Sequence, residues 1–329
     1  MSVENKNQEV IQDSANKNKF NSRSSYPGEK RWGDRKDGWV LKNLSSFSNL
    51  VPHLMTSRNS SAIYFKEKID VTDFVMYVED KNNELSKNPL KTPEGIIDKI
   101  TYFNLFLAAL VRLFSVKPHL NRFISGRKFY QRKKIEIAFV AKKEFTEEGE
   151  ETTIKKSFKR DETLWSIVSK LNKGIKIVKT EDADDATDIL NLFAKFPKII
   201  VHLAISFLDF LDYIDRYPKD IYKEDPMHAS VFVANLGSIG LRNVPYHHLY
   251  DRGTTSVFIC LGEIHKDRIH DEKTGKLVER YFVEISTTID ERISDGFYYI
   301  RAMNEFKEII NNPKALEEKL ERFPIDDAI

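Results

Sequence analysis

The chain has 329 residues, of which 41% are hydrophobic and 12% aromatic, so it can form one large or two ordinary globular domains. Its 52 basic and 50 acidic residues give a formal net charge of +2, which provides no electrostatic basis for nucleic acid or a membrane surface as the main partner. The single cysteine, Cys260, excludes a disulfide framework and a cysteine-rich zinc site.

Residues 1–37 predict a disordered polar arm. The first 21 residues are rich in Asn, Lys, Gln, Glu and Ser and contain no apolar segment, so they are not a secretory signal and a cytoplasmic location is expected. The arm can bury too little apolar surface to offset the entropy of ordering. We therefore expect the folded domain over residues 38–329.

The first elements of this domain follow from the spacing of apolar residues. A helical spacing over residues 45–57 precedes a strand-like run at 62–70, and a second helix is expected over 71–85. Thr92 is expected to cap a helix that runs through residues 100–113. Further along the chain we expect a strand, a hairpin tip and two helices, over residues 134–141, 144–153, 161–173 and 180–196.

Two segments suggest other partners. Residues 127–134 combine cations with Phe129 and Tyr130, which is typical of nucleic-acid binding, but no other segment adds to this patch. A charged connection between a helix and a strand is favoured there, and we expect no nucleic-acid partner. Residues 199–214 are the most membrane-like, but they include two aspartates and fall short of the ~20 apolar residues that span a bilayer. A buried or interface helix is favoured, with no membrane partner.

The last third of the chain shows the clearest pattern. Three strand-like runs at residues 228–236, 254–264 and 277–289 have short connections, which makes consecutive strands neighbours. Between the last run and a closing helix, a turn carries Glu291 and Asp295. Backbone N–H groups and positive partial charge gather at a helix start, so negative charge is favoured at this turn.

This turn resembles a family signature. Glu291, Asp295 and Gly296 have the spacing of the His-x-x-x-Asp-Gly motif of the chloramphenicol acetyltransferase-like superfamily, with Glu291 at the position of the histidine. Residues 230–240 resemble the family segment Thr-Phe-Thr-Ile-Ser-Asn-Leu-Gly, with Ala234 in place of the serine. Weaker similarities lie at Met55, Ile69-Asp70 and the Pro-x-x-Asn turn of Pro118 and Asn121. The closest family is the catalytic domain of 2-oxo acid dehydrogenase acyltransferases (dihydrolipoyl acyltransferase).

The resemblance covers about residues 45–313 and implies the fold. It implies an α/β two-layer sandwich with a mixed β-sheet and helices on one face. It also implies a homotrimer whose active-site channels lie between subunits. We find no Asp-Lys-Ala lipoyl-lysine site and expect a catalytic-type domain without lipoyl or peripheral-subunit-binding domains.

The implied activity is acyl transfer from coenzyme A or an acyl-CoA, without a covalently bound cofactor. In the family the histidine takes the proton of the thiol or hydroxyl acceptor, and the serine donates a hydrogen bond to the oxyanion. Ala234 has no such donor, which typically costs on the order of 100- to 1000-fold in rate. With Glu291 as the base, the pKa difference between base and thiol is larger by ~2 units than with histidine, which corresponds to about 3 kcal/mol. The alternative is a catalytically inactive homologue that acts as a trimeric binding or scaffold protein.

The remaining candidate residues surround these two segments. Asn235 could contact substrate, although alternation along a strand aims it away from the face of Ala234. His247 and His248 lie on the next loop, where packing or surface roles are favoured over a catalytic one.

Three further expectations concern ions and charged partners. In the family the aspartate of the motif pairs with an arginine that braces the turn. For Asp295, a candidate catalytic residue, this structural role is favoured over direct chemistry, and the candidate partners are Arg58, Arg242, Arg252 and Arg292. Some cations of residues 127–134 could meet the phosphates of coenzyme A. No metal is expected, because no spacing matches a known site.

Overall fold

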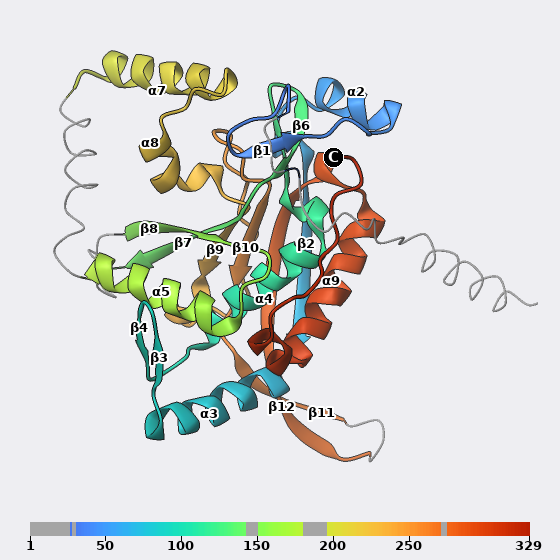
Figure 1. Cartoon of the computed structure of the whole chain (residues 1–329). Helices are drawn as coiled ribbons and strands as arrows, with labels where there is room; N and C mark the ends of the chain where they lie inside the picture. Colours follow the sequence, from blue (N-terminus) through green and yellow to red (C-terminus); the bar gives the residue numbers. More distant parts are fainter. Residues whose placement is uncertain (1–26, 28–30, 143–150, 180–195, 271–274) are drawn as a thin grey trace, which may run out of the picture.

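The computed structural model describes residues 27, 31–142, 151–179, 196–270 and 275–329 (Figure 1). Its centre is a seven-stranded sheet in the order β11-β12-β10-β9-β7-β8, with β2 also paired to β12. β9 is parallel to both β7 and β10, and the other pairs are antiparallel, so the predicted mixed sheet is confirmed. The strands are β2 (Ala62–Asp70), β7 (Ile135–Lys142), β8 (Glu151–Phe158), β9 (Val231–Asn235), β10 (Val257–Leu261), β11 (His265–His270) and β12 (Leu277–Asp290).

Long helices cover one face of this sheet (Figure 1). The central helix is α4, which is apolar around most of its circumference and therefore buries residues on all sides. Its side chains join those of the sheet in one large apolar core, which includes the fully buried Phe74, Leu107 and Phe139. The helices are α3 (Thr72–Lys87), α4 (Tyr102–Val116), α5 (Leu164–Lys179) and α9 (Gly296–Asn311). The predicted two-layer α/β sandwich is confirmed.

The opposite face of the sheet, which we call the helix-free face, has its own apolar cluster. Phe232 and Phe258 stack there with ring centroids 4.9 Å apart. Val244 and Leu249, from the connection between β9 and β10, are buried against them. The segment that carries His247 and His248 therefore packs on this face.

A smaller three-stranded sheet lies beside one end of the main sheet (Figure 1). It contains β1 (Gly38–Val40), β5 (Arg122–Ser125) and β6 (Lys128–Arg132). The interpretation of residues 127–134 as a charged connection was wrong, because β6 is a strand with a buried end. Arg132 is 1% exposed, and its guanidinium donates a 2.7 Å hydrogen bond to the carbonyl oxygen of Thr254.

The predicted arm lies largely outside the described residues. The structure describes residues 31–37 of this arm, and in them Asp34 and Arg35 are buried. Arg35 Nη2 lies 2.6 Å from Asp212 Oδ1, and Arg31 Nη1 donates a 3.1 Å hydrogen bond to the carbonyl of Ile329. These contacts begin several residues before β1.

The helix predicted to start at Thr92 begins later. Thr92 ends β3 (Leu90–Thr92), which pairs with β4 (Gly95–Ile97) in a hairpin. Gly95 has a φ of 144°, a conformation that suits glycine and breaks a helix. The N-cap of α4 is Thr101 instead, in a capping box with Asn104.

Two more helices follow outside the main layers, α7 (Lys198–Tyr213) and α8 (Lys219–Glu224), and α2 (Ser46–Leu54) lies near the small sheet. α7 has no buried residue, so a buried helix was wrong there and an interface helix stays a prediction. Among the described residues, no helix has the length and apolarity that crossing a membrane requires. The helix predicted over residues 180–196 and much of the tip over 144–153 lie outside the described residues.

Candidate functional site

The turn after β12 is built as the sequence predicts, a strand that leads into a helix. β12 ends at Asp290, a 3-10 turn covers Glu291–Ile293, and α9 begins at Gly296. The Glu291 side chain is exposed. Asp295 is the N-cap of α9 and accepts a 2.8 Å hydrogen bond from the backbone N–H of Tyr298. The turn therefore presents one free carboxylate, Glu291, next to a capped helix start.

The arginine brace of this turn belongs to Asp290 and not to Asp295. Asp290 is fully buried and accepts 2.8 Å hydrogen bonds from both Nε and Nη2 of Arg292. Arg58 Nε lies 4.0 Å from the same carboxylate, and burial lowers the pKa of Arg58 to about 10. The prediction that Asp295 pairs with an arginine was wrong, because its carboxylate instead accepts a hydrogen bond from a backbone N–H at the start of α9. The other two candidates pair elsewhere, Arg242 with Glu263 and Arg252 with Asp209.

The segment of Ala234 and Asn235 lies at the end of β9 and places its two residues on opposite faces. Ala234 packs against the apolar cluster of the helix-free face. Asn235 lines a cavity of about 330 Å³ whose other lining residues include Gly237, Ser238, Tyr102, Phe103 and Phe106. Gly237 is required here, because a Cβ at this position would collide with the carbonyl oxygen of Gly262.

One chain does not bring Ala234 and Glu291 together. Ala234 is paired with Cys260, and Cys260 with Ser286 of β12. Glu291 follows Ser286 by five residues along an extended strand, which is roughly 16 Å at 3.3 Å per residue. Two strand spacings also separate the residues laterally, so the two altered motif positions lie far apart within a chain.

The His247 ring is held by packing. It stacks on Phe258 with centroids 3.9 Å apart and an interplanar angle of 8°, and its Nδ1 lies 2.6 Å from the carbonyl oxygen of His248. Burial lowers the pKa of His247. His248 is exposed. The His247 ring therefore lies on the helix-free face, over Phe258.

Sequence reasoning missed His119, which contacts the closing turn. Its Nδ1 lies 3.2 Å from Ser294 Oγ, and its ring stacks on Tyr298 with centroids 4.3 Å apart. On the other side of the ring, Nε2 lies 3.6 Å from Asp327 Oδ1 and 3.8 Å from Asp326 Oδ1. His119 is part of the Pro-x-x-Asn turn, but nothing in the sequence links that turn to Ser294, 175 residues away.

His119, Asp326 and Asp327 also form a group whose ligand-type atoms all lie within 4.8 Å of one another. Asp326 is buried and accepts 2.6 Å hydrogen bonds from both Nε and Nη2 of Arg122. Its carboxylate is therefore already neutralised by a guanidinium, which weakens it as a metal ligand. The nearby imidazole of His119 and the Arg122 guanidinium lower the pKa of Asp327 to about 2, although partial burial opposes this shift.

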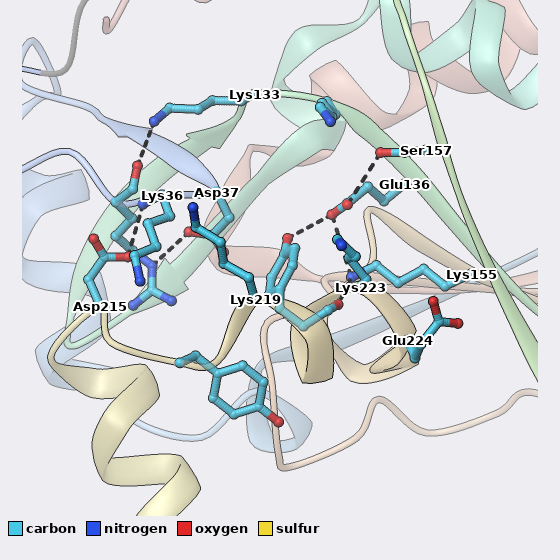
Figure 2. Close-up of a pocket in the computed structure, with 14 residues that line it drawn as sticks. Lys36, Asp37, Lys133, Glu136, Lys155, Ser157, Asp215, Lys219, Lys223 and Glu224 are labelled. Atoms are coloured by element: carbon cyan, nitrogen blue, oxygen red, sulfur yellow. Dashed lines mark hydrogen bonds and ion pairs between the residues drawn. The ribbon is translucent and has the colours of Figure 1, made fainter. Parts of the chain in front are cut away.

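A second cavity, of about 480 Å³, is rich in lysine (Figure 2). It lies between the N-terminal segment, the start of β7, the end of β8 and α8. Seven basic and four acidic side chains line it, so its wall has an excess of positive charge. The basic residues are Arg35, Lys36, Lys133, Lys134, Lys155, Lys219 and Lys223.

The buried wall of this lysine cavity is a hydrogen-bonded network. Lys155 Nζ donates a 2.8 Å hydrogen bond to the carbonyl of Tyr222 and lies 3.7 Å from Glu136 Oε2. The Tyr222 hydroxyl donates a 2.7 Å hydrogen bond to Glu136. Burial lowers the pKa of Lys155 to about 8. Lys36, Lys134 and Lys219 are exposed at the cavity and can contact an anion.

Comparison with known proteins agrees with this architecture. Residues 218–317 match the model of the 2-oxoacid dehydrogenases acyltransferase catalytic domain. No match was found among curated proteins. The matched residues include both the Ala234 segment and the closing turn, and they begin after α7.

Solved structures share the fold at low sequence identity. A probable dihydrolipoamide acetyltransferase from Listeria monocytogenes has 14% identity and a TM-score of 0.50, over 87% of this chain and 96% of that chain. The cubic core of a pyruvate dehydrogenase multienzyme complex has 13% identity and a TM-score of 0.51, over 89% of this chain and 99% of that one. The chain thus has the fold of these acetyltransferase cores, and its residues 218–317 match the model of the 2-oxoacid dehydrogenases acyltransferase catalytic domain.

Proposed function

We propose that the protein transfers an acyl group from an acyl-CoA to a small acceptor. The observation that carries this proposal is the match of residues 218–317, which include the exposed turn at the start of α9, to an acyltransferase catalytic domain. Glu291 takes the place of the family histidine as the general base. Asp295 holds the turn by capping α9, so the carboxylate of Glu291 stays at the helix start.

The proposed contacts with donor and acceptor lie in the two cavities and on the helix-free face. Asn235, in the cavity of about 330 Å³, contacts the donor. The phosphates of coenzyme A meet the exposed lysines of the lysine cavity, where positive charge exceeds negative. His247 and His248 contact the acceptor from the helix-free face. No covalently bound cofactor and no metal are part of this scheme.

The proposal includes a homotrimer in the cytoplasm. The separation of Glu291 from Ala234 and Asn235 within one chain supports an assembly in which a second subunit completes each site. A reducing compartment agrees with the single buried thiol, Cys260. The molar mass in solution, measured by light scattering, should be three times that of the chain. A monomer that transfers acyl groups would contradict the shared site.

The first experiment measures thiol release from a panel of acyl-CoA donors with mixed acceptors. Native protein should release thiol, and Glu291→Ala should lower the rate by on the order of 100-fold or more, as expected for loss of a general base. Glu308→Gln, which removes another exposed carboxylate farther along α9, is the matched control and should act like native protein. Equal rates for native protein and Glu291→Ala would reject the carboxylate base.

The phosphate contacts need a separate test. Lys36→Gln combined with Lys219→Gln should raise KM for the acyl-CoA about tenfold, because a loss of about 1.4 kcal/mol in binding changes affinity by that factor. The turnover number should stay the same, since Glu291 is not among the residues that line the lysine cavity. Lys87→Gln on α3 is the control. An unchanged KM would place the phosphates elsewhere.

The second candidate function is a catalytically inactive homologue that acts as a trimeric binding or scaffold protein. The replacement of both the family histidine, by Glu291, and the family serine, by Ala234, favours it. In that case no donor should release thiol at any pH, while acyl-CoA or coenzyme A should still bind. Calorimetric titration with coenzyme A separates this outcome from a protein without any coenzyme A site.

A further inference from the structure

Ser294, His119 and the aspartates of the C-terminal tail form a series of groups that the proposed reaction does not use. Ser294 Oγ lies 3.2 Å from His119 Nδ1, which is hydrogen-bond distance. His119 Nε2, on the far side of the ring, faces Asp327 Oδ1 at 3.6 Å and Asp326 Oδ1 at 3.8 Å. A hydroxyl, an imidazole and a carboxylate in this order are the arrangement that activates a serine nucleophile.

The imidazole is held in place from several sides. Tyr298 stacks on it with an interplanar angle of 11°, and the Tyr298 hydroxyl accepts a 3.1 Å hydrogen bond from the backbone N–H of His119. Arg122 binds Asp326 through two 2.6 Å hydrogen bonds. Arg122 Nη1 also donates a 3.3 Å hydrogen bond to the carbonyl of Ile293, next to Ser294. One guanidinium therefore fixes the tail relative to the turn.

A substrate can reach this group. The His119 side chain is 23% exposed, and Ser294 is also partly exposed. Ser294 lies two residues before α9, whose first turn is capped by Asp295.

We propose that Ser294 is an acyl-accepting nucleophile and that His119 is its general base, an inference that rests on the proposed acyl transfer. Ser294 Oγ attacks the carbonyl carbon of the acyl thioester while His119 Nδ1 takes the hydroxyl proton. The tetrahedral intermediate collapses, the C–S bond breaks, and the thiolate takes the proton from His119. The products of this half-reaction are acyl-Ser294 and free thiol.

The second half-reaction returns the enzyme to its first state. The acceptor loses its proton to His119 and attacks the acyl-serine carbonyl carbon, the C–O bond to Ser294 breaks, and Ser294 Oγ takes the proton back. In this scheme the base comes from the Pro118–Asn121 turn and from no part of β12 or α9. The scheme gives Glu291 no proton to transfer, so it replaces the carboxylate base of the proposed function and predicts thiol release that Glu291→Ala leaves unchanged.

The test uses the full chain and p-nitrophenyl acetate, an activated acetyl ester, with the modified peptide identified by mass spectrometry. Native protein should carry one acetyl group on Ser294 and release nitrophenol in a burst. Ser294→Ala should lose that label, and His119→Gln should slow labelling by 100- to 10,000-fold, the usual contribution of a general base. Ser294→Cys, which keeps a nucleophile in place, should again be labelled at residue 294.

The labelling experiment has control variants, and three outcomes would contradict the scheme. Ser86→Ala and His202→Gln change exposed residues elsewhere and should label like native protein. An unlabelled Ser294 in folded native protein, or labelling of Ser294 that His119→Gln does not slow, would overturn the inference. If His119 instead binds a metal, added zinc should change the labelling and a chelator should restore it, whether or not Ser294 is present. That result would also overturn the inference.

The same experiment separates this inference from the proposed function. Thiol release from acyl-CoA that depends on Glu291 but not on Ser294 would keep acyl transfer and reject the serine nucleophile. Labelling of Ser294 by the ester, with no thiol release from any acyl-CoA, would keep the nucleophile and reject acyl-CoA as the donor.

Discussion

Asp290 and Arg292, two residues apart, form a two-point ion pair that is buried under the closing turn. The carboxylate of Asp290 is fully buried, and both of its oxygens accept 2.8 Å hydrogen bonds from the Arg292 guanidinium. Arg292 Nη1 also donates a 2.8 Å hydrogen bond to the carbonyl of Met55, so the pair connects the turn to the segment after α2. The pair fixes the position from which Glu291 and Ser294 project.

Removal of one partner should leave an uncompensated buried charge. Asp290→Ala should lower the free energy of unfolding by about 3–5 kcal/mol, measured by urea denaturation. The double variant Asp290→Ala with Arg292→Met removes both charges and should be more stable than Asp290→Ala alone. A double variant that is the less stable of the two would show that the charges do not act on each other.

Asp295 should contribute much less, as a helix cap. Asp295→Ala should lower the free energy of unfolding by about 1 kcal/mol, because the backbone N–H of Tyr298 loses its acceptor. Asp295→Asn keeps an acceptor oxygen at the N-cap and should restore most of that loss. Destabilisation by Asp295→Asn as large as that by Asp290→Ala would instead indicate a charged partner for Asp295.

The sequence was informative where local pattern decides structure. The strand-like run over residues 277–289 identified β12. The motif around Asn235 and Gly237 identified the end of β9, where the backbone of Gly262 leaves no room for a side chain. The closing turn was correctly placed between strand and helix, since β12 ends at Asp290 and α9 begins at Gly296. These features depend on neighbours in sequence or on one close approach.

The rest depends on contacts between distant residues. Arg132 looked like a solvated cation, but carbonyl oxygens of His228 and Thr254, 96 and 122 residues away, satisfy it in the interior. His119 reached Ser294 only through the tertiary fold. Asp295 was given an arginine because sequence cannot distinguish a cap from an ion pair when both require a carboxylate at the same turn.

Two glycines of the resemblance should respond in opposite ways to alanine. Gly237→Ala should cost about 1–3 kcal/mol of folding free energy, since its Cβ would meet the backbone of Gly262 and neither segment can move freely. Gly296→Ala should be neutral or stabilising by up to about 1 kcal/mol, because no atom lies within 4 Å of its Cβ and its φ is not positive. Thermal melting of both variants checks this, and equal losses would contradict the contact with Gly262.

α7 should tolerate polar substitution. Its exposed apolar side chains include Ile199, Leu203 and Phe210, which are 69%, 62% and 56% exposed. Leu203→Gln with Phe210→Gln should change the unfolding free energy of the single chain by less than about 1 kcal/mol. If α7 is an interface helix, the molar mass in solution should fall with the same substitutions. A large loss of stability in a monomer would mean that α7 packs on the body of its own chain.

His228 should give the stability of the protein a pH dependence. Its Nδ1 lies 3.2 Å from Asp225 and its Nε2 lies 3.4 Å from Asp212, and although burial opposes protonation, the two carboxylates raise the pKa of His228. Against the effect of burial, His228 and Arg35 lower the pKa of Asp212 to about 2, and that of Asp225 is lowered as well.

The raised pKa of His228 stabilises the folded state fully below the unfolded value near 6.5, and this contribution is lost as pH rises through the folded pKa. The lowered aspartate pKa values act on the acid side: their contribution is present above about pH 4 and is lost as pH falls towards 2. Urea denaturation should therefore find maximal stability from this group between about pH 4 and 6.5.

His228→Gln should remove the decline above pH 6.5, which amounts to about 1.4 kcal/mol for each unit by which the pKa is raised. His247 provides a control of opposite sign, because burial lowers its pKa and its contribution is lost as pH falls through the folded value. His247→Gln should flatten the curve below pH 6.5 and leave the alkaline side alone. If His228→Gln kept the alkaline decline of native protein, the imidazole between Asp212 and Asp225 would not be its source.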